Sequence, residues 1–178
     1  DYKDKGFNLK LRINEEDVLP AIAIGINDIA GTGFYSSEYI VASYGINKTD
    51  FHFGLGWGTL NGSKKSFNNL LGKINDDFYY RPIRYEDKGG QFQPSRYFSG
   101  ETISPFFGFT HAINDRYLLK IEYDTTVTPG QVGYDAPEQD FSFGVDFNIS
   151  KNFTIGISSE RGNYTSLRLS YKNDPKIS

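Results

Sequence analysis

Large apolar residues alternate with small or polar ones along most of this chain, with a period of two. Residues 6–13 show the pattern clearly: Phe7, Leu9, Leu11 and Ile13 alternate with Asn8, Lys10 and Arg12. The same alternation recurs over residues 21–26, 35–44, 49–60, 102–110, 116–124, 141–149, 152–160 and 164–171. Successive side chains of a β-strand point to opposite faces of the sheet. The pattern therefore predicts an all-β, antiparallel protein of about nine strands, and it shows no convincing helix.

Residues Gly25 to Tyr44 carry the most specific pattern, a strand, a glycine-rich turn and a second strand. In the first strand isoleucines occupy one face, and alanines and Gly25 occupy the other. Gly31 and Gly33 supply the backbone freedom that a reversal needs. We expect Asp28 and Glu38 to lie on or beside the small, polar face of this hairpin.

The longest irregular stretch is residues 61–100, which are rich in Gly, Asn, Asp, Lys and Tyr. A loop of this length inside a compact domain is typical of a functional excursion. A short strand is expected within it, around Phe78 to Ile83. The predicted organisation is one β-domain over residues 1–172, with residues 61–100 as a loop excursion and residues 173–178 as a polar tail.

Composition excludes several classes of protein. The chain has 178 residues and a formal net charge of -3, with a pI near 5.4, and it has no Lys/Arg-rich run, so no nucleic-acid partner is expected. The absence of Cys excludes disulfides and thiolate zinc sites. The absence of Met indicates a processed chain or a fragment. No run of 18 apolar residues predicts a transmembrane helix, but the short strands of a membrane barrel would escape such a search.

Two architectures fit the alternation, and they differ in which face meets water. In a soluble barrel or sandwich, which would bind a sugar or an apolar ligand, the apolar face is the core. In an outer-membrane barrel that face meets lipid and the polar face lines the lumen. Three features favour the membrane barrel: a polar face rich in glycine, short connections alternating with long ones, and aromatic residues near strand ends. These last are Tyr35, Tyr44, Trp57, Tyr117, Tyr123, Tyr164 and Tyr171.

The favoured prediction is thus an up-and-down, transmembrane-type β-barrel. Closed single-chain bacterial barrels have an even number of strands. Nine strands therefore indicate an incomplete barrel or a strand that the pattern does not show.

Charged residues of the polar face and the hairpin are the candidate site. They are Lys10, Arg12, Asp28, Glu38, His52, Lys120, Glu122, Asp146, Glu160 and Arg168. In one interpretation they line a lumen and contact a glycan; in the other they form salt bridges that hold a narrow barrel shut. Aromatic residues of the long loop could stack on sugar rings or simply pack the loop. They are Tyr79, Tyr80, Tyr85, Phe92 and Tyr97.

No motif for catalysis is present. The two histidines, His52 and His111, lie on different predicted strands, and no Ser-His-Asp, HExxH or phosphate-loop spacing occurs. A surface hydrolase that uses Glu38 or Glu122 is the remaining enzymatic hypothesis. We predict no catalytic residue, no cofactor and no metal site.

Several short segments together resemble one protein family. They include YKDKGF at residues 2–7, LPAIAIG at 19–25, DIAGTG at 28–33, SSEY at 36–39, GLGWG at 54–58, PFFG at 105–108, KIEY at 120–123 and ERGN at 160–163. These segments are similar to the YjbH family of Gram-negative outer-membrane barrel proteins associated with exopolysaccharide. Only scattered residues of the 61–100 loop match.

The resemblance implies an outer-membrane location and a role in the secretion or assembly of an exopolysaccharide or capsule. It implies a non-enzymatic conduit or scaffold. The partners that it implies are outer-membrane lipid, the polysaccharide and other proteins of the secretion machinery.

Overall fold

The computed structural model describes residues 6–62, 65–82, 92–127 and 137–173. All nine predicted strands are present: β1 (Phe7–Asn14), β2 (Ala21–Ile29), β3 (Ser37–Ile46), β4 (Thr49–Gly58), β6 (Thr102–Ala112), β7 (Tyr117–Tyr123), β8 (Phe141–Asn148), β9 (Phe153–Glu160) and β10 (Tyr164–Tyr171). A tenth, β5 (Phe67–Asn68), has two residues. The all-β prediction is confirmed.

The strands form an antiparallel meander. Their order in the sheet is β1-β2-β3-β4-β6-β7-β8-β9-β10, and β5 pairs with β6 beside this path. The pairings among the described residues do not join β1 to β10, so the sheet is not closed and a barrel is not confirmed. In the described part of the chain, no helix has the length and apolar character needed to cross a membrane.

The chain groups into two compact units. The first comprises residues 1–44, 52–106 and 125–134, and the second comprises residues 45–51, 107–124 and 135–178. The organisation as one domain over residues 1–172 stays a prediction, and residues 174–178 of the polar tail lie outside the described residues.

Aromatic rings cover two strand glycines of the first unit. Gly25 pairs with Tyr39 across the β2–β3 hairpin, and a Cβ added at Gly25 would lie 2.1 Å from Cζ of Tyr39. A Cβ at Gly54 of β4 would likewise lie 2.1 Å from Cζ of Phe106. The two rings meet edge to face at 6.4 Å between centroids. The small residues therefore make room for aromatic side chains of the same face.

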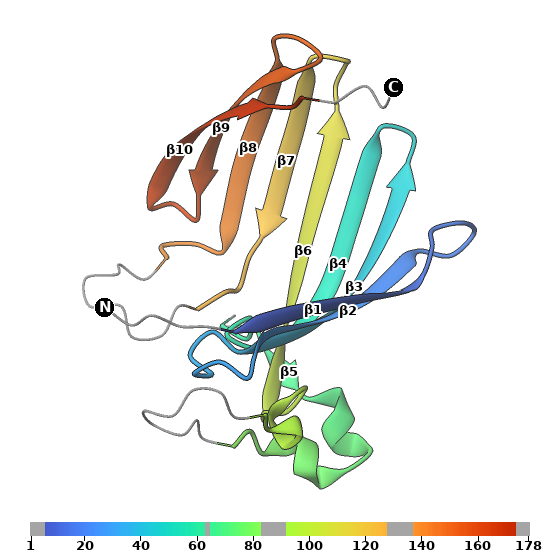
Figure 1. Cartoon of the computed structure of the whole chain (residues 1–178), viewed down its shortest axis with the longest axis vertical. Coiled ribbons are helices and arrows are strands. Elements are labelled where there is room, and N and C mark those ends of the chain that lie inside the picture. The colour runs from blue at the N-terminus through green and yellow to red at the C-terminus, as the bar shows by residue number, and fades with distance from the viewer. Residues whose placement is uncertain (1–5, 63–64, 83–91, 128–136, 174–178) are drawn as a thin grey trace. The chain divides into compact units, whose positions relative to one another are not determined.

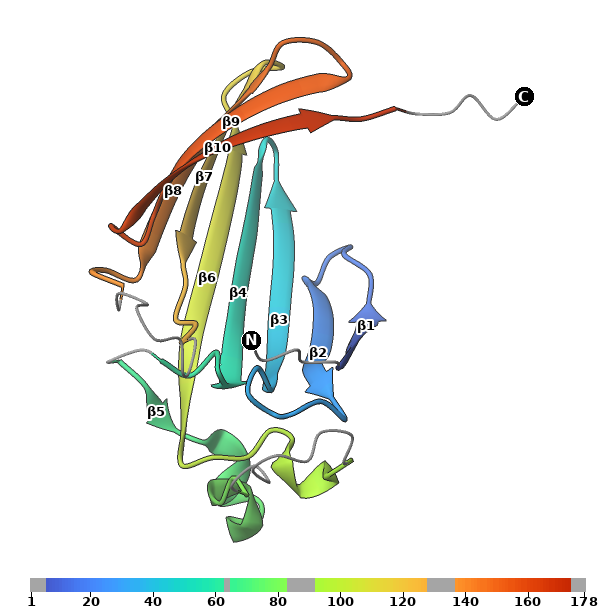
Figure 2. The same ribbon diagram turned by 60° about the vertical axis from the view of Figure 1, so that its left-hand side comes forward.

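The 61–100 excursion contains three short 3₁₀ helices: η1 (Leu70–Lys73), η2 (Asp76–Tyr79) and η3 (Pro94–Arg96). Figures 1 and 2 show η1 and η2 packed beside each other. The strand predicted around Phe78 to Ile83 is wrong, because Phe78 and Tyr79 belong to η2; residue 83 lies outside the described residues. Asn75 is the N-cap of η2. Its side chain accepts a hydrogen bond from the Asp77 N–H, which favours a helical turn at this point.

Strands β7 to β10 of the second unit separate apolar from polar side chains. Leu119, Val145, Ile157 and Leu167 pair in one row across the four strands. The neighbouring rows carry Lys120, Gly144, Ser158 and Ser166, then Leu118, Asp146, Gly156 and Arg168. Figure 1 shows β8, β9 and β10 as successive strands of this sheet.

Burial is inverted relative to a soluble protein. Val145 is 38 % exposed, Ile157 56 % and Leu167 70 %. Within the described ranges only four hydrophobic residues are buried, namely Ala23, Trp57, Ile103 and Tyr123. Nine buried residues are polar or charged: Asp28, Ser36, Ser37, Glu38, Asn69, Ser99, Ser104, Thr125 and Asp146. Burial also corrects the aromatic pattern, because Trp57 and Tyr123 are covered and cannot belong to an exposed belt.

Candidate functional site

A charged cavity of about 500 Å³ lies on the polar face of β7 to β10. Its lining includes five of the ten predicted site residues, which are Lys120, Glu122, Asp146, Glu160 and Arg168. Three serine side chains, those of Ser142, Ser158 and Ser166, add hydroxyl groups to the same lining. The alternation of the sequence thus brings these residues together on one face of one unit.

Asp146 is the centre of an ion triad in this cavity. Its Oδ2 lies 2.8 Å from Nζ of Lys120 and 2.5 Å from Nη2 of Arg168. The Asp146 side chain is 11 % exposed, whereas that of Arg168 is 54 % exposed. The two cations therefore shield the carboxylate and present their own surface to the cavity.

A second basic residue, Arg161, lies at the end of the cavity where β9 turns into β10. Its guanidinium lies 3.9 Å from Asp124 and 3.6 Å from Asp140. Glu160 accepts a hydrogen bond from Ser158 at 3.1 Å. This end of the cavity is therefore richer in carboxylates than the end that holds Asp146.

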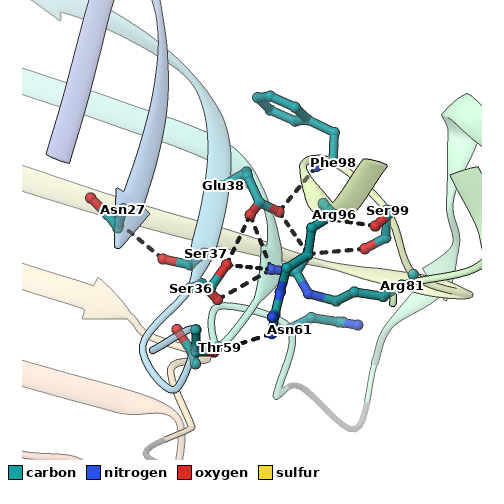
Figure 3. A network of polar contacts seen from close by, with 12 residues as sticks. Asn27, Ser36, Ser37, Glu38, Thr59, Asn61, Arg81, Arg96, Phe98 and Ser99 are labelled. Carbon is teal, nitrogen blue, oxygen red and sulfur yellow. Dashed lines mark hydrogen bonds and ion pairs between the residues drawn. The ribbon is translucent and has the colours of Figure 1, made fainter. Parts of the chain in front are cut away.

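A buried clasp in the first unit joins the β2–β3 hairpin to the excursion (Figure 3). Arg81 donates to both carboxylate oxygens of Glu38, at 2.8 and 3.0 Å. The Phe98 N–H donates to the same carboxylate at 3.1 Å. Arg81 also donates to the Ser36 hydroxyl at 2.9 Å and to the Ser99 carbonyl at 3.1 Å. Glu38 is completely buried, so the hydrogen-bond donors to its carboxylate are protein groups.

Unusual backbone conformations gather at this clasp. Phe98 has a φ of 58°, and Asp28 and Ala30 of the hairpin have φ values of 60° and 56°. For residues with a Cβ such values carry a cost and persist only where surrounding contacts hold them. Gly58 (φ 63°) is also constrained sterically, since a Cβ there would lie 2.3 Å from the Ser36 carbonyl oxygen.

Two aromatic residues complete the clasp. Trp57 packs edge to face on Phe98 with centroids 5.2 Å apart. Burial raises the pKa of the Tyr97 hydroxyl, and the carboxylates of Glu38 and Asp28 raise it further. Tyr97 therefore stays neutral under ordinary conditions and adds no charge to this packed region.

The position expected for Glu38 on the small face is wrong. The register pairs Glu38 with Ile26, which places it on the isoleucine face. The reason is the connection between β2 and β3, whose length and positive-φ residues fix a register that alternation alone cannot give. Asp28 is buried at the end of β2, where its N–H bonds to the Asn8 side chain.

The remaining predicted residues of the first unit are exposed. Lys10 and Arg12 pair with Gly25 and Ala23, as the small-face prediction requires. Arg12 forms an exposed ion pair with Glu15 at 2.8 Å. His52 contacts Ser43 at 2.8 Å. Whether any of the ten residues contacts a glycan stays a prediction.

Two residues that organise the excursion, Arg81 and Asn69, are not apparent from the sequence pattern. Asn69 is fully buried and its Nδ2 lies 3.0 Å from the carbonyl oxygens of Phe78, Phe98 and Gly100. No periodicity marks either residue. The Leu70–Leu71 pair after Asn69 was the available signal, because Asn followed by apolar residues is a common start of a helical turn.

The aromatic residues of the loop have different surroundings. The ring of Tyr79 packs against Gly72. The rings of Phe92 and Tyr97 lie with their centroids 5.8 Å apart. Tyr80 is 75 % exposed, and Tyr85 lies outside the described residues. In the parts of the chain that are described, no three His, Asp or Glu side chains converge to hold a metal ion.

Comparison with known sequences identifies the family. The YjbH family model, described as "Exopolysaccharide biosynthesis protein YbjH", matches residues 1–178. The chain belongs to the YjbH family. A relative from Escherichia coli (strain K12), named "Uncharacterized lipoprotein YjbH", is 36% identical over 165 residues, which cover 91% of this chain. The chain spans 23% of that YjbH relative's length. No solved structure matches the chain.

Family membership supports the resemblance found in the sequence and its association with exopolysaccharide. The YjbH match extends through the 61–100 excursion, where the sequence comparison by motif found only scattered residues. The clasp and the charged cavity therefore both lie within the region that defines the family match.

Proposed function

We propose that this chain is part of an outer-membrane β-barrel whose apolar face meets lipid and whose polar face contacts an exopolysaccharide during secretion or assembly. In this proposal it is a non-enzymatic conduit or scaffold. The single observation that carries the proposal is the inverted burial, in which apolar side chains are exposed and polar side chains are buried.

Leu119, Val145, Ile157 and Leu167 form one apolar row, and the last three of these side chains are exposed. Leaving a side chain of this size in water instead of burying it forgoes about 1.5–3 kcal/mol. Ile157 and Leu167 are more than half exposed, and both strands repeat such residues at every second position. A lipid environment would cover this face, and it would leave the polar face as the wet side.

The cavity supports contact with a carbohydrate. It offers serine hydroxyls, carboxylates and basic groups on one surface, which together supply donors and acceptors for sugar hydroxyls. A conduit must bind its cargo weakly enough to release it. Ion pairing of Asp146 with Lys120 and Arg168 lowers the charge offered to the polymer.

The partners in this proposal are outer-membrane lipid, the polysaccharide and other proteins of the secretion machinery. The family description supports the link to exopolysaccharide. The word lipoprotein in the name of the E. coli relative supports membrane association.

Site-directed labelling tests which face meets lipid. The chain contains no Cys, so single-Cys variants place one nitroxide label without removing any native thiol. We would label Leu167 and Ser166, which are adjacent on β10, and Ile157 and Ser158, which are adjacent on β9. In bilayers, labels at Leu167 and Ile157 should collide mainly with oxygen, which partitions into lipid. Labels at Ser166 and Ser158 should collide mainly with a water-soluble nickel chelate. Equal access of the nickel chelate to all four labels would contradict the proposal.

A further inference from the structure

We infer that Lys120 and Arg168 form a subsite for the carboxylate of an acidic sugar, which lies over Gly144 in the cavity. This inference rests on the proposed function and names the class of polymer. The feature that carries it is a carboxylate, Asp146, that is buried beneath two more exposed cations.

The charges of the triad do not cancel. One carboxylate faces one ammonium and one guanidinium, so the group carries a net charge of about +1. Asp146 is 11 % exposed, whereas Lys120 and Arg168 are 31 % and 54 % exposed. A ligand that lies over Gly144 therefore meets these two cations and not the Asp146 carboxylate.

Both cations keep donors for a ligand. A guanidinium has five N–H groups and an ammonium has three. Among the described residues, the contacts with Asp146 use one nitrogen of Arg168 and the single nitrogen of Lys120. A guanidinium matches a carboxylate with two parallel hydrogen bonds, which is the geometry that distinguishes an acidic sugar from a neutral one.

Gly144 provides the floor of the subsite. It pairs with Lys120 on one side and with Ser158 on the other. A Cβ added at Gly144 would lie 3.4 Å from the nearest atom, which is ordinary contact. The space above it is therefore open to a ligand, and Ser158 and Ser166 in the same row can bond to ring hydroxyls.

Glu122 allows a test of whether the bound sugar is acidic or basic. It lines the same cavity and lies two residues along β7 from Lys120, on the same face. A carboxylate at that distance repels an acidic sugar and attracts a basic one. Its removal should strengthen the binding of an acidic ligand and weaken that of a basic ligand.

Calorimetry on the protein in detergent tests the subsite. The probes are an oligogalacturonate and its fully methyl-esterified form, which has the same backbone without the charge. We expect the acidic probe to bind more tightly and to lose affinity between low and high salt. Arg168→Gln and Lys120→Gln should each weaken it by about tenfold or more, the loss typical of a charged hydrogen bond. Lys151→Gln, in the exposed β8–β9 turn, is the matched control and should bind as the unchanged protein does.

Two further variants distinguish a loss of the subsite from a loss of folding. Gly144→Ala adds a Cβ to the floor with only ordinary contacts, so it should weaken binding while leaving the unfolding transition in place. Glu122→Gln should tighten binding of the acidic probe several-fold.

Equal binding of the two probes, or weaker binding with Glu122→Gln, would overturn the acidic-sugar subsite and leave the proposed function standing. Binding of neither probe would also overturn the subsite, and the label accessibilities would then decide the proposed function separately.

Discussion

Arg168 of β10 reaches Asp146 of β8 across Gly156 of β9. The register places Gly156 opposite both residues, and the guanidinium and carboxylate meet at 2.5 Å. A Cβ at Gly156 would lie 2.4 Å from Oδ1 of Asp146 and 3.3 Å from Nε of Arg168. The missing side chain thus allows an ion pair between strands that are not neighbours.

The first prediction concerns this gap. Gly156→Ala should displace the Asp146 carboxylate and destabilise the protein by about 1–3 kcal/mol, as overpacking does elsewhere. The measurement is the free energy of unfolding in urea, in the same detergent for all variants. In an Asp146→Ala background the same substitution should cost less, because the atom that it would meet is gone.

Gly144→Ala is the matched control, since it lies on the same face of the adjacent strand and its Cβ would meet only ordinary contacts. It should change stability by no more than about 0.5 kcal/mol. If the two glycine substitutions had equal effects, the ion pair would not depend on the gap at Gly156.

The second prediction concerns the clasp. Glu38→Gln should destabilise the protein by about 3–5 kcal/mol, because removing one partner of a buried pair leaves the other charge uncompensated. The double variant Glu38→Gln with Arg81→Gln should cost less than the sum of the two single variants. Urea unfolding gives the energies, and limited proteolysis within residues 61–100 reports release of the excursion.

Arg12→Gln is the control for the clasp. Its ion pair with Glu15 is largely exposed, and such pairs contribute about 0–1 kcal/mol. A comparable loss of stability from Arg12→Gln and Glu38→Gln would mean that burial of Glu38 does not govern the clasp.

The strands and their faces were predictable because alternation is a local property. Phe143 and Val145 lie on one face of β8 while Gly144 and Asp146 lie on the other, as their spacing requires. The same spacing places Lys120, Asp146 and Arg168 on one face once the strand order is known. For β7 to β10 the alternation therefore indicates which charged residues share a face, while their contact with a glycan stays a prediction.

The clasp was not predictable, because it depends on register and on distant residues. Glu38 pairs with Ile26 only through the particular connection between β2 and β3, and Arg81 lies 43 residues further along the chain. The strand that was expected near Phe78 is also absent. The residues there have a composition that favours strands, but the capping bond of Asn75 stabilises a helical turn. Local patterns carry no information on such long-range bonds.

The third prediction concerns Asn69, whose amide donates to the carbonyl oxygens of Phe78, Phe98 and Gly100. Asn69→Asp replaces the donor by a carboxylate facing those carbonyls. We expect a loss of about 2–4 kcal/mol, combining unmade hydrogen bonds with a buried charge, and faster proteolysis within residues 61–100. Asn114→Asp is the control, because its exposed side chain accepts from the N–H groups of Arg116 and Tyr117 and a carboxylate accepts such bonds as well as an amide does. Equal sensitivity of the two variants would argue against a central role for Asn69.

The last prediction separates a lipid-facing strand from a soluble one by energy. Leu167 is 70 % exposed, so in a soluble protein Leu167→Arg would change stability by only about 0.5 kcal/mol. On the lipid face of a membrane strand the same change should cost up to about 2–4 kcal/mol, depending on its depth in the bilayer. Ser166→Arg, one residue earlier and facing the charged cavity, should have a much smaller effect because that face stays wet. The measurement is the free energy of unfolding of both variants in lipid bilayers. A small cost for both would place the apolar face in water, whereas a large cost confined to Leu167→Arg requires that β10 present this face to lipid.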